Sequence, residues 1–494
     1  MTAYFLTVIK EEYYMKKRLT AAFIAILLTS VSCAGNGTSV QTDTQKTEVP
    51  ETTEQTNPFE SMETANFDGR TFTILDANQY PDLHINIPGE EINGEVVNDA
   101  LFERGLTVGQ RFNTVIEYVQ MTPSDKGIQT LKSSVLAGDD DYQLCISTIR
   151  GGSGGSLGTI ATEGLLANLA DMDSLNLDKP WWSRLMYENL CLNDKMYFTS
   201  GDISPAMYNM AACVYLNKKL LGDYGITTDY YQMVRDGKWT IDELISLAKD
   251  KDRDLNDNGV MHTNDDFFGF IHQPNDTTIS MMMIGCGLKL SDLSDGKIEI
   301  NLNSQHAYDV YEKISELKRI VKFDQQDDTI KKAFFNDRAL SMLHLVDSTV
   351  MLRPMESDFS VLPVPKYDTE QAEYYSLCNP WCDAFSAIPI TADPEFAGMI
   401  TEALARYSYT NIRPKVLELN LKQKALRDEE SIEMLDIIYD STYLDFNSCY
   451  VFGGLTEKLA DAIMKDKPVA SVVESLLPAA DADAEKLVEE AFSK

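Results

Sequence analysis

The sequence predicts a mixed α/β protein that is divided into two lobes. Its 494 residues exceed the roughly 100–200 residues of one average domain. Strand and helix patterns alternate from about residue 69, which indicates a parallel α/β sheet. The pattern becomes mostly helical near residue 215 and changes back near residue 380. We therefore expect the chain to cross between the lobes more than once.

The first lobe begins with three strand patterns separated by two helix patterns. The strands are expected at 71–75, 114–119 and 142–147, and the helices at about 96–113 and 125–137. Ligands of such sheets bind beyond the carboxyl ends of the strands. A glycine-rich segment at 151–158 follows the third strand, but it lacks the spacing of phosphate-binding loops. We interpret it as a flexible loop at the ligand edge of the sheet.

The second half of the pattern is less regular. Residues 207–216, MYNMAACVYL, are apolar almost throughout and predict a buried strand. Helical patterns dominate from 217 to about 345. Strands are expected again at 359–364 and 384–389, helices at about 394–408 and 428–440, and a helical tail at 454–494.

The first 33 residues have the order of a signal peptide. Met15 is followed by three basic residues at 16–18, and residues 19–31 are apolar or small. Met15 fits better than Met1 as the start, because Glu11 and Glu12 suit a signal poorly. The run at 19–31 is shorter than the roughly 17–25 residues that span a bilayer, so we expect cleavage rather than a transmembrane anchor.

Residues 28–33, LTSVSC, resemble the bacterial lipobox. This resemblance implies that Cys33 is lipidated and becomes the mature N-terminus, although Ser30 stands where the box usually has leucine. Ordinary secretory cleavage is the alternative. Residues 34–64 are rich in Thr, Glu and Gln and cannot bury enough apolar surface to order themselves. They are expected to form a flexible tether.

Charge and cysteine content exclude other classes. The 77 acidic and 43 basic residues give a net charge of −34, which repels nucleic acid. Apart from Cys33 there are seven cysteines, an odd number that a complete disulfide framework cannot use. We expect buried free thiols. The spacing of Cys378 and Cys382 fits neither a thioredoxin-type pair nor a zinc site.

The order of several motifs resembles that of bacterial extracellular solute-binding proteins of the carbohydrate type, which serve ABC importers. The matching segments are LAGDDDY at 136–142, KPWW at 179–182, VYLNKKLLGDYG at 214–225, GKWTIDEL at 237–244, VLPVPKY at 361–367 and AFSAIP at 384–389. The resemblance covers about 68–480. It implies a two-lobe periplasmic-binding-protein-like fold, with hinge crossovers and a ligand cleft between the lobes.

This resemblance also implies an organisation and partners. We assign residues 65–213 and about 381–440 to the first lobe, and residues 214–380 and about 441–494 to the second. The expected partners are a small solute, such as a sugar, and the permease subunits of an ABC importer. We expect a monomer outside the cytoplasm that is held at the cell membrane by its N-terminal lipid.

Residues 254–265 have the spacing of an EF-hand calcium loop. Counted from Asp254, Asn256 and Asn258 occupy the third and fifth positions, Gly259 the sixth and Asp265 the twelfth. The carbonyl of Val260 would supply the seventh ligand position. The sequence therefore predicts a structural Ca²⁺ site, and an acidic solvated turn is the alternative.

Tryptophans in apparent loops are candidates for stacking on a sugar ring. Trp381 precedes Asp383, whose carboxylate is a candidate for hydrogen bonding to the ligand, just before a strand near the expected crossover. Trp181 and Trp182 follow a proline. For each of these tryptophans, core packing is the alternative role. Four weaker polar candidates stand at the ends of strand patterns: Arg150, Asp202, Asn209 and Asp347.

Common catalytic motifs are absent from the sequence. The sequence contains no HExxH, GxSxG or Walker motif, so we expect a binding protein rather than an enzyme. A glycosidase remains an alternative because its two carboxylates need no fixed spacing. The stronger alternative is a lipid-anchored surface protein that binds glycans or peptides without a transport role.

Overall fold

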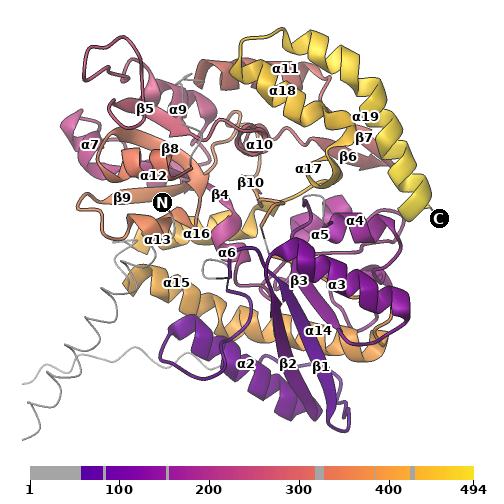
Figure 1. Ribbon diagram of the computed structural model, residues 1–494. Helices are drawn as coiled ribbons and strands as arrows, with labels where there is room; N and C mark the ends of the chain where they lie inside the picture. Colours follow the sequence, from indigo (N-terminus) through magenta and orange to yellow (C-terminus); the bar gives the residue numbers. More distant parts are fainter. Residues whose placement is uncertain are drawn as a thin grey trace, which may run out of the picture. The chain divides into compact units, whose positions relative to one another are not determined.

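The structure is a computed structural model that describes residues 57–81, 85–151, 155–317, 327–382, 384–422 and 429–493. The predicted signal peptide, Cys33 and most of the predicted tether lie outside these residues. Contacts divide the chain into Met1–Gln55 and Thr56–Lys494, and only the second unit is described below. Two four-stranded sheets form the centres of its two lobes (Figure 1).

The sheet of the first lobe has the strand order β11-β3-β1-β2. Its strands are β1 (Arg70–Ala77), β2 (Thr114–Met121), β3 (Leu144–Ser147) and β11 (Phe385–Ala387). β1 pairs in parallel with both β2 and β3, whereas β11 returns antiparallel to β3. The three strands predicted for this lobe are confirmed, and their carboxyl ends lie at one edge of the sheet.

Helices cover this sheet. They are α2 (Val96–Phe112), α3 (Ser124–Ala137), α4 (Leu157–Thr162), α5 (Arg184–Leu190), α14 (Pro394–Asn411) and α15 (Arg413–Lys422), with a 3₁₀ turn at Leu169–Asp171. Asp393 caps the N-terminus of α14 by accepting the backbone N–H groups of Glu395 and Phe396. Pro394 is the first residue of the helix. α14 and α15 pack against α2.

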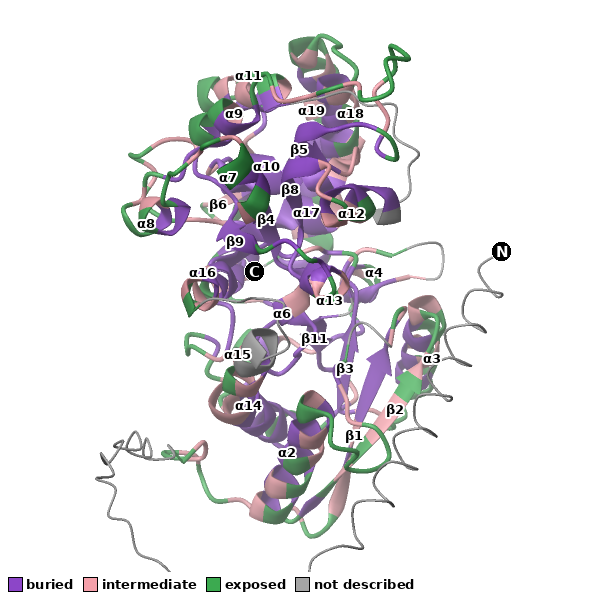
Figure 2. Cartoon of the chain, turned by 90° about the vertical axis from the view of Figure 1, so that its left-hand side faces the viewer, coloured by how far each residue is buried: buried purple, intermediate pink, exposed green. Residues whose placement is uncertain are grey.

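The sheet of the second lobe has the order β5-β8-β4-β9. Its strands are β4 (Ala212–Asn217), β5 (Phe268–His272), β8 (Ala339–Leu345) and β9 (Phe359–Pro363). Every residue of these strands is buried (Figure 2). Strands that are buried along their whole length are typical of a sheet that is covered on both faces.

The helices of the second lobe range from 5 to 23 residues in length. They are α7 (Lys218–Asp223), α8 (Tyr230–Arg235), α9 (Ile241–Ala248), α10 (Asp276–Gly285), α11 (Gln305–Leu317), α12 (Asp327–Phe335), α13 (Ser348–Leu352), α16 (Glu429–Asp440), α17 (Phe446–Tyr450), α18 (Leu455–Met464) and α19 (Val469–Ala491). A hairpin of β6 (Ser291–Ser294) and β7 (Lys297–Ile300) and a 3₁₀ turn at Phe452–Gly454 complete this part.

The segments between the lobes contain short elements. The first crossing contains α6 (Met207–Met210), and β10 (Ser376–Leu377) pairs in parallel with β12 (Thr442–Tyr443). The prediction of one strand over 207–216 is therefore wrong in its first half. The backbone turns helical at Met207 and becomes a strand only at Ala212, because apolar runs of this length do not distinguish a buried helix from a strand.

Two other sequence predictions need correction. The region predicted to be mainly helical, 217 to about 345, contains β5, β6, β7 and β8. The predicted boundary near 440 places α16 in the first lobe, yet α16 packs against β9 of the second sheet. The strand predicted at 359–364 and the helix predicted at 394–408 are confirmed as β9 and α14.

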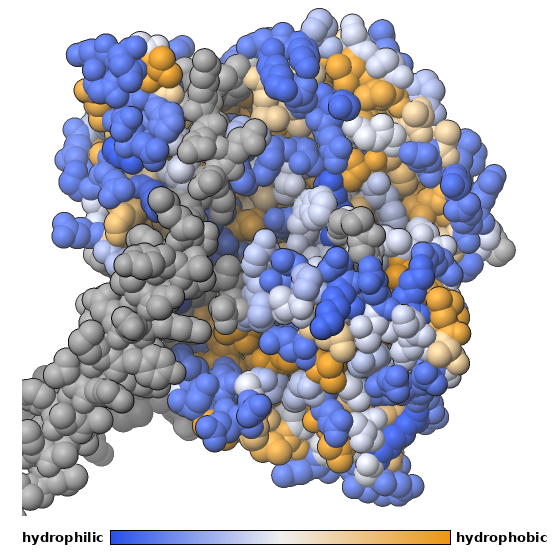
Figure 3. Space-filling model, in the orientation of Figure 1, coloured by the Kyte–Doolittle hydropathy of each residue, from blue (hydrophilic) through white to orange (hydrophobic). Residues whose placement is uncertain are grey.

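The cysteines of the described residues are mostly buried, and apolar side chains on the surface are scattered. Seven described cysteines are free, and all except Cys191 are buried. Burial raises the pKa of the Cys145 and Cys213 thiols. The face shown in Figure 3 is largely hydrophilic, with hydrophobic residues in separate patches. No helix among the described residues is long and apolar enough to cross a membrane.

Candidate functional site

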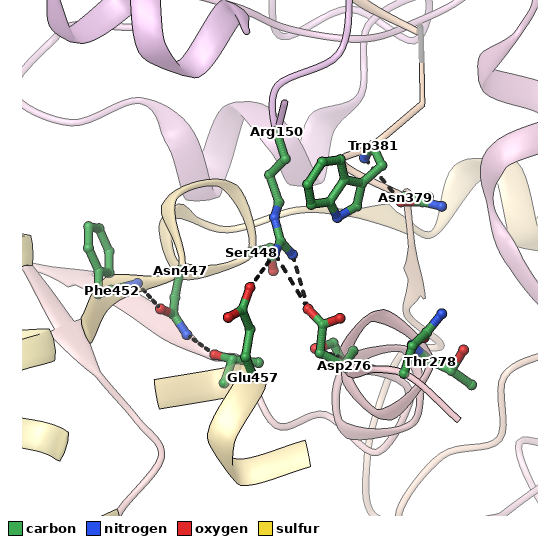
Figure 4. A network of polar contacts seen from close by, with 12 residues as sticks. Arg150, Asp276, Thr278, Asn379, Trp381, Asn447, Ser448, Phe452 and Glu457 are labelled. Carbon is green, nitrogen blue, oxygen red and sulfur yellow. Dashed lines mark hydrogen bonds and ion pairs between the residues drawn. The ribbon is translucent and has the colours of Figure 1, made fainter. Parts of the chain in front are cut away.

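Arg150 connects the two lobes. It follows β3, and the backbone N–H groups of Ile149 and Arg150 donate to the Pro380 carbonyl, 3.2 and 3.0 Å away. Its guanidinium lies 3.4 Å from the Asp276 carboxylate at the start of α10. It also lies 3.2 Å from the Glu457 carboxylate in the first turn of α18 (Figure 4). One first-lobe cation is thus shared by two second-lobe carboxylates.

Trp381 lies beside this ion pair. The Arg150 guanidinium carbon is 4.8 Å from the centroid of the Trp381 ring, which is within the range of a cation–π interaction. The Trp381 backbone N–H donates to Asn379 Oδ1 at 3.0 Å. The side chain of Trp381 is 44% exposed, which is unusual for tryptophan. An exposed indole that is held against a cation offers a flat apolar face to a ligand.

A buried polar network positions Glu457. Asn447 donates to Thr456 Oγ1 at 2.8 Å and accepts the backbone N–H of Phe452 at 3.0 Å. Asp445, at the N-terminus of α17, accepts the backbone N–H groups of Leu290 and Ser448. These bonds fix the loop that leads into α18 and hence the position of Glu457.

A cavity of about 1420 Å³ reaches from the first lobe to the second. α2 and β2 of the first lobe line much of it, and Val350 and Arg353 around α13 contribute from the second lobe. Asn209 of α6 also lines it. The Asp347 backbone N–H donates to the Asn209 carbonyl at 2.9 Å, which ties the start of α13 to the crossing segment. The cavity is large enough for an oligomeric small molecule.

The predicted polar candidates fall in different environments. Arg150 pairs with Asp276 and Glu457 of the other lobe, and Asn209 lines the cavity. Asp347 is partly covered, with its carboxylate 3.9 Å from Lys331 Nζ and 3.5 Å from His344 Nδ1. Asp383 lies outside the described residues.

Asp202 is buried in the first crossing segment and accepts a hydrogen bond from the Tyr208 hydroxyl. Burial raises the pKa of this carboxyl to about 7, against the opposing effects of Arg413 and of the Tyr208 bond. The structure therefore gives Asp202 a place within the connection between the lobes rather than on an open ligand surface.

Trp181 and Trp182 pack against α14. Trp182 is 3% exposed, and its indole N–H donates to Glu402 at 2.9 Å. Trp181 lies under the guanidinium of Arg406, which is 4.5 Å from the ring centroid, and beside Tyr409. Trp182 therefore has no ring face open to a ligand, and Trp381 is the best placed of the three candidates.

The predicted calcium loop is organised by its own side chains. The Asp254 carboxylate accepts the backbone N–H groups of Asn258 and Gly259 at 3.3 and 2.6 Å. Asn258 Oδ1 accepts the N–H of Val260 at 2.8 Å. Gly259 has a φ of 78°, the left-handed conformation that favours glycine at this position. The oxygens of Asp254 and Asn258 therefore accept backbone N–H groups of their own turn.

The end of this loop differs from the expected pattern. Asp266 is buried and accepts the N–H groups of Leu255 and His262 at 2.9 and 2.6 Å, whereas Asp265 is exposed. Among the described residues, no group of three or more His, Cys, Asp or Glu side chains could hold a metal ion. A Ca²⁺ ion here would therefore depend on amide and carbonyl oxygens as well as on Asp254.

Sequence reasoning missed three residues of this region: Asp276, Glu457 and Arg353. Asp276 directly follows Asn275, whose side chain accepts the N–H of Thr278 and so begins α10. That local pattern predicts the start of a helix. It does not tell which of 77 acidic residues faces the other lobe, because the approach of α10 and α18 to Arg150 is a property of the tertiary structure.

Comparisons with known proteins identify the fold. No protein-family model and no curated protein matches the sequence. Among solved structures, a cyclo/maltodextrin-binding protein in complex with maltotetraose matches over 86% of this chain and 98% of its own, with 14% identity and a TM-score of 0.55. A maltose-binding periplasmic protein from Listeria monocytogenes in complex with maltose matches over 86% and 100%, with 13% identity and a TM-score of 0.54. The chain therefore has the two-lobe fold of these binding proteins.

Proposed function

We propose that this protein is an extracytoplasmic solute-binding lipoprotein that captures an oligosaccharide between its lobes for an ABC importer. The observation that carries this proposal is that Arg150, Trp381, Asp276 and Glu457 meet across the two lobes, and that the two lobes also share the lining of one cavity. Solved proteins of the same fold hold maltose and maltotetraose.

The chemistry of this region suits a sugar. An exposed aromatic ring can stack on the apolar C–H face of a pyranose, and amide side chains such as Asn209 and Gln110 on the cavity wall can donate to and accept from hydroxyl groups. Closing the lobes over the sugar would add contacts from both sides. The protein would thus bind and release its ligand without changing it.

Two features of the proposal concern the rest of the chain. Cys33 would carry the lipid that anchors the protein to the membrane, and the permease subunits would recognise the closed form. A Ca²⁺ ion held by Asp254, Asn256, Asn258 and Val260, with Asp265 as a further ligand, would be structural, because the loop precedes β5 rather than lining the cavity.

A binding screen tests the proposal. Mature protein is incubated with neutral and acidic oligosaccharides and with short peptides, and melting temperature and calorimetric affinity are measured. We expect stabilisation by a saccharide and full recovery of that saccharide afterwards. Release of shorter sugars would instead indicate a glycosidase, and stabilisation by peptides alone would indicate a surface peptide-binding protein.

A further inference from the structure

The cavity between the lobes has one cationic side chain among its described lining residues. This residue is Arg353, which directly follows α13 in the second lobe. The acidic lining residues are Glu90, Glu95 and Glu117, and all three are exposed. Arg353 itself is only partly accessible. The carboxylates therefore stand where water screens them, and the guanidinium stands deeper.

Arg353 lacks a direct partner among the described residues. Its Nε atom is buried and has no hydrogen-bond acceptor among the described residues. Burial lowers the pKa of Arg353, and the opposing effect of the Glu95 charge, which raises this pKa, is smaller. The Nε–H group is a buried donor, and its unmade hydrogen bond costs free energy until a ligand supplies an acceptor.

Arg150, which joins the two lobes, is not among the lining residues of this cavity and is already engaged. Arg150 is shared by Asp276 and Glu457, so its guanidinium is neutralised by groups of the protein. The net charge of −34 disfavours anionic ligands in general. An acidic ligand would therefore need a local cation, and Arg353 is the described residue of the cavity that can provide one.

We propose that Arg353 binds a carboxylate of the captured saccharide, so that the ligand class is an acidic oligosaccharide that contains uronic acid. The planar guanidinium pairs with the two oxygens of a carboxylate in a bidentate geometry. Asn209, on the crossing segment that lines the same cavity, offers an amide to the neighbouring hydroxyl groups. This inference rests on the proposed function and specifies its ligand.

The test compares a uronic acid oligosaccharide with its own methyl ester. We use trigalacturonate, its fully methylated ester, maltotriose and trialanine as probes, and measure affinity by calorimetry. The ester keeps the sugar skeleton and replaces each carboxylate with an uncharged methyl ester, which is larger by one methyl group. We expect trigalacturonate to bind about 10- to 100-fold more tightly than its ester, which is the range of a charged hydrogen bond.

Three variants assign this preference to one residue. R353Q should reduce the preference for the acid over the ester to about 2-fold or less. R353K should retain part of this preference, because lysine keeps the charge but cannot pair with a carboxylate in the bidentate geometry of a guanidinium. R235Q is the matched control. It removes an arginine that pairs with Glu430 and Glu433 outside the cavity, and it should leave the preference unchanged.

The other outcomes separate this inference from the proposed function. If maltotriose or the ester binds as tightly as the acid, or if R353Q weakens acid and ester equally, the carboxylate assignment is wrong while saccharide binding stands. If trialanine binds and no saccharide does, both proposals fail. Melting curves of R353Q establish that the variant is folded before its affinities are compared.

Discussion

Arg150 and Glu457 are 307 positions apart in the chain, and their charged groups lie 3.2 Å apart in the structure. One follows a strand of the first lobe, and the other belongs to the first turn of α18. A contact of this kind exists only when the lobes are close together. It therefore connects the closed arrangement to two residues that can be changed one at a time.

The first prediction concerns this ion pair. R150Q and E457Q should each weaken saccharide binding about 1.4- to 5-fold, because closure would lose an interaction worth about 0.2–1 kcal/mol. The double variant should lose less than the sum of both effects. K132Q, which breaks a pair with Glu163 inside the first lobe, should bind normally. Strictly additive losses would show that Arg150 and Glu457 are not coupled.

The second prediction separates two tryptophans. W381A should weaken saccharide binding by about 1 kcal/mol or more, taking about 1–3 kcal/mol for aromatic stacking on nucleic-acid bases as a guide, with little change in melting temperature. W182A should do the opposite. It opens a core position next to Glu402 and should cost about 3–5 kcal/mol of stability. Calorimetry and thermal unfolding of both variants check this, and unaltered affinity in W381A would remove Trp381 from the site.

The third prediction concerns pH and Asp202. Its pKa is about 7 in the folded protein, against an ordinary value of 3.8, so the folded state binds the proton more tightly than the unfolded state. The contribution of this group to stability is therefore greatest at low pH and declines as pH rises from about 4 to about 7. Above that range it stays constant. D202N, which mimics the protonated carboxyl, should remove this component of the slope.

Urea unfolding at a series of pH values measures this effect. D223N is a suitable control, because Asp223 is exposed and pairs with Lys219 on the surface of α7. The control should keep the slope of the unaltered protein. If D202N also keeps that slope, the raised pKa of Asp202 is not the cause.

The fourth prediction concerns calcium. Mature protein should melt at a higher temperature with Ca²⁺, and a site saturated at 100 times its dissociation constant should add about 2.7 kcal/mol. D254N keeps an oxygen that can accept the N–H groups of Asn258 and Gly259 but removes the charge, so it should abolish most of the rise. If the melting temperature of D254N rises equally with Ca²⁺, the ion does not bind at Asp254.

The loop also allows a finer comparison. D265N tests the twelfth position of the predicted pattern, whereas D266N changes the buried carboxylate that closes the loop. We expect D265N to reduce the Ca²⁺-dependent rise and D266N to lower stability even without Ca²⁺. A Ca²⁺ effect that is insensitive to D265N would show that this exposed carboxylate is not a ligand.

Sequence patterns predicted the elements that depend on local order. The alternation of β1, α2, β2, α3 and β3 is visible because each element has its own period and the connections are short. The prediction for the segment around Met207 is wrong because a segment buried on all sides is apolar throughout. It then lacks the alternation of apolar and polar residues that distinguishes a helix from a strand. β8 was missed for a related reason, since all its residues are buried.

The site was less predictable than the fold. Trp381 stands out in the sequence as a tryptophan in a loop, but so do Trp181 and Trp182, and only the packing of α14 separates them. Arg150 was a candidate by its place after a strand. Its partners Asp276 and Glu457 come from distant segments that only the folded chain brings together, and no local pattern marks them.

The central claim is that the two lobes close on a saccharide without cleaving it. Small-angle scattering of the mature protein, with and without a saccharide found in the binding screen, tests this claim most directly when the recovered saccharide is analysed by chromatography. The account predicts a smaller radius of gyration with ligand and a saccharide that is recovered intact. An unchanged radius at saturating ligand, or the accumulation of shorter sugars, would contradict it.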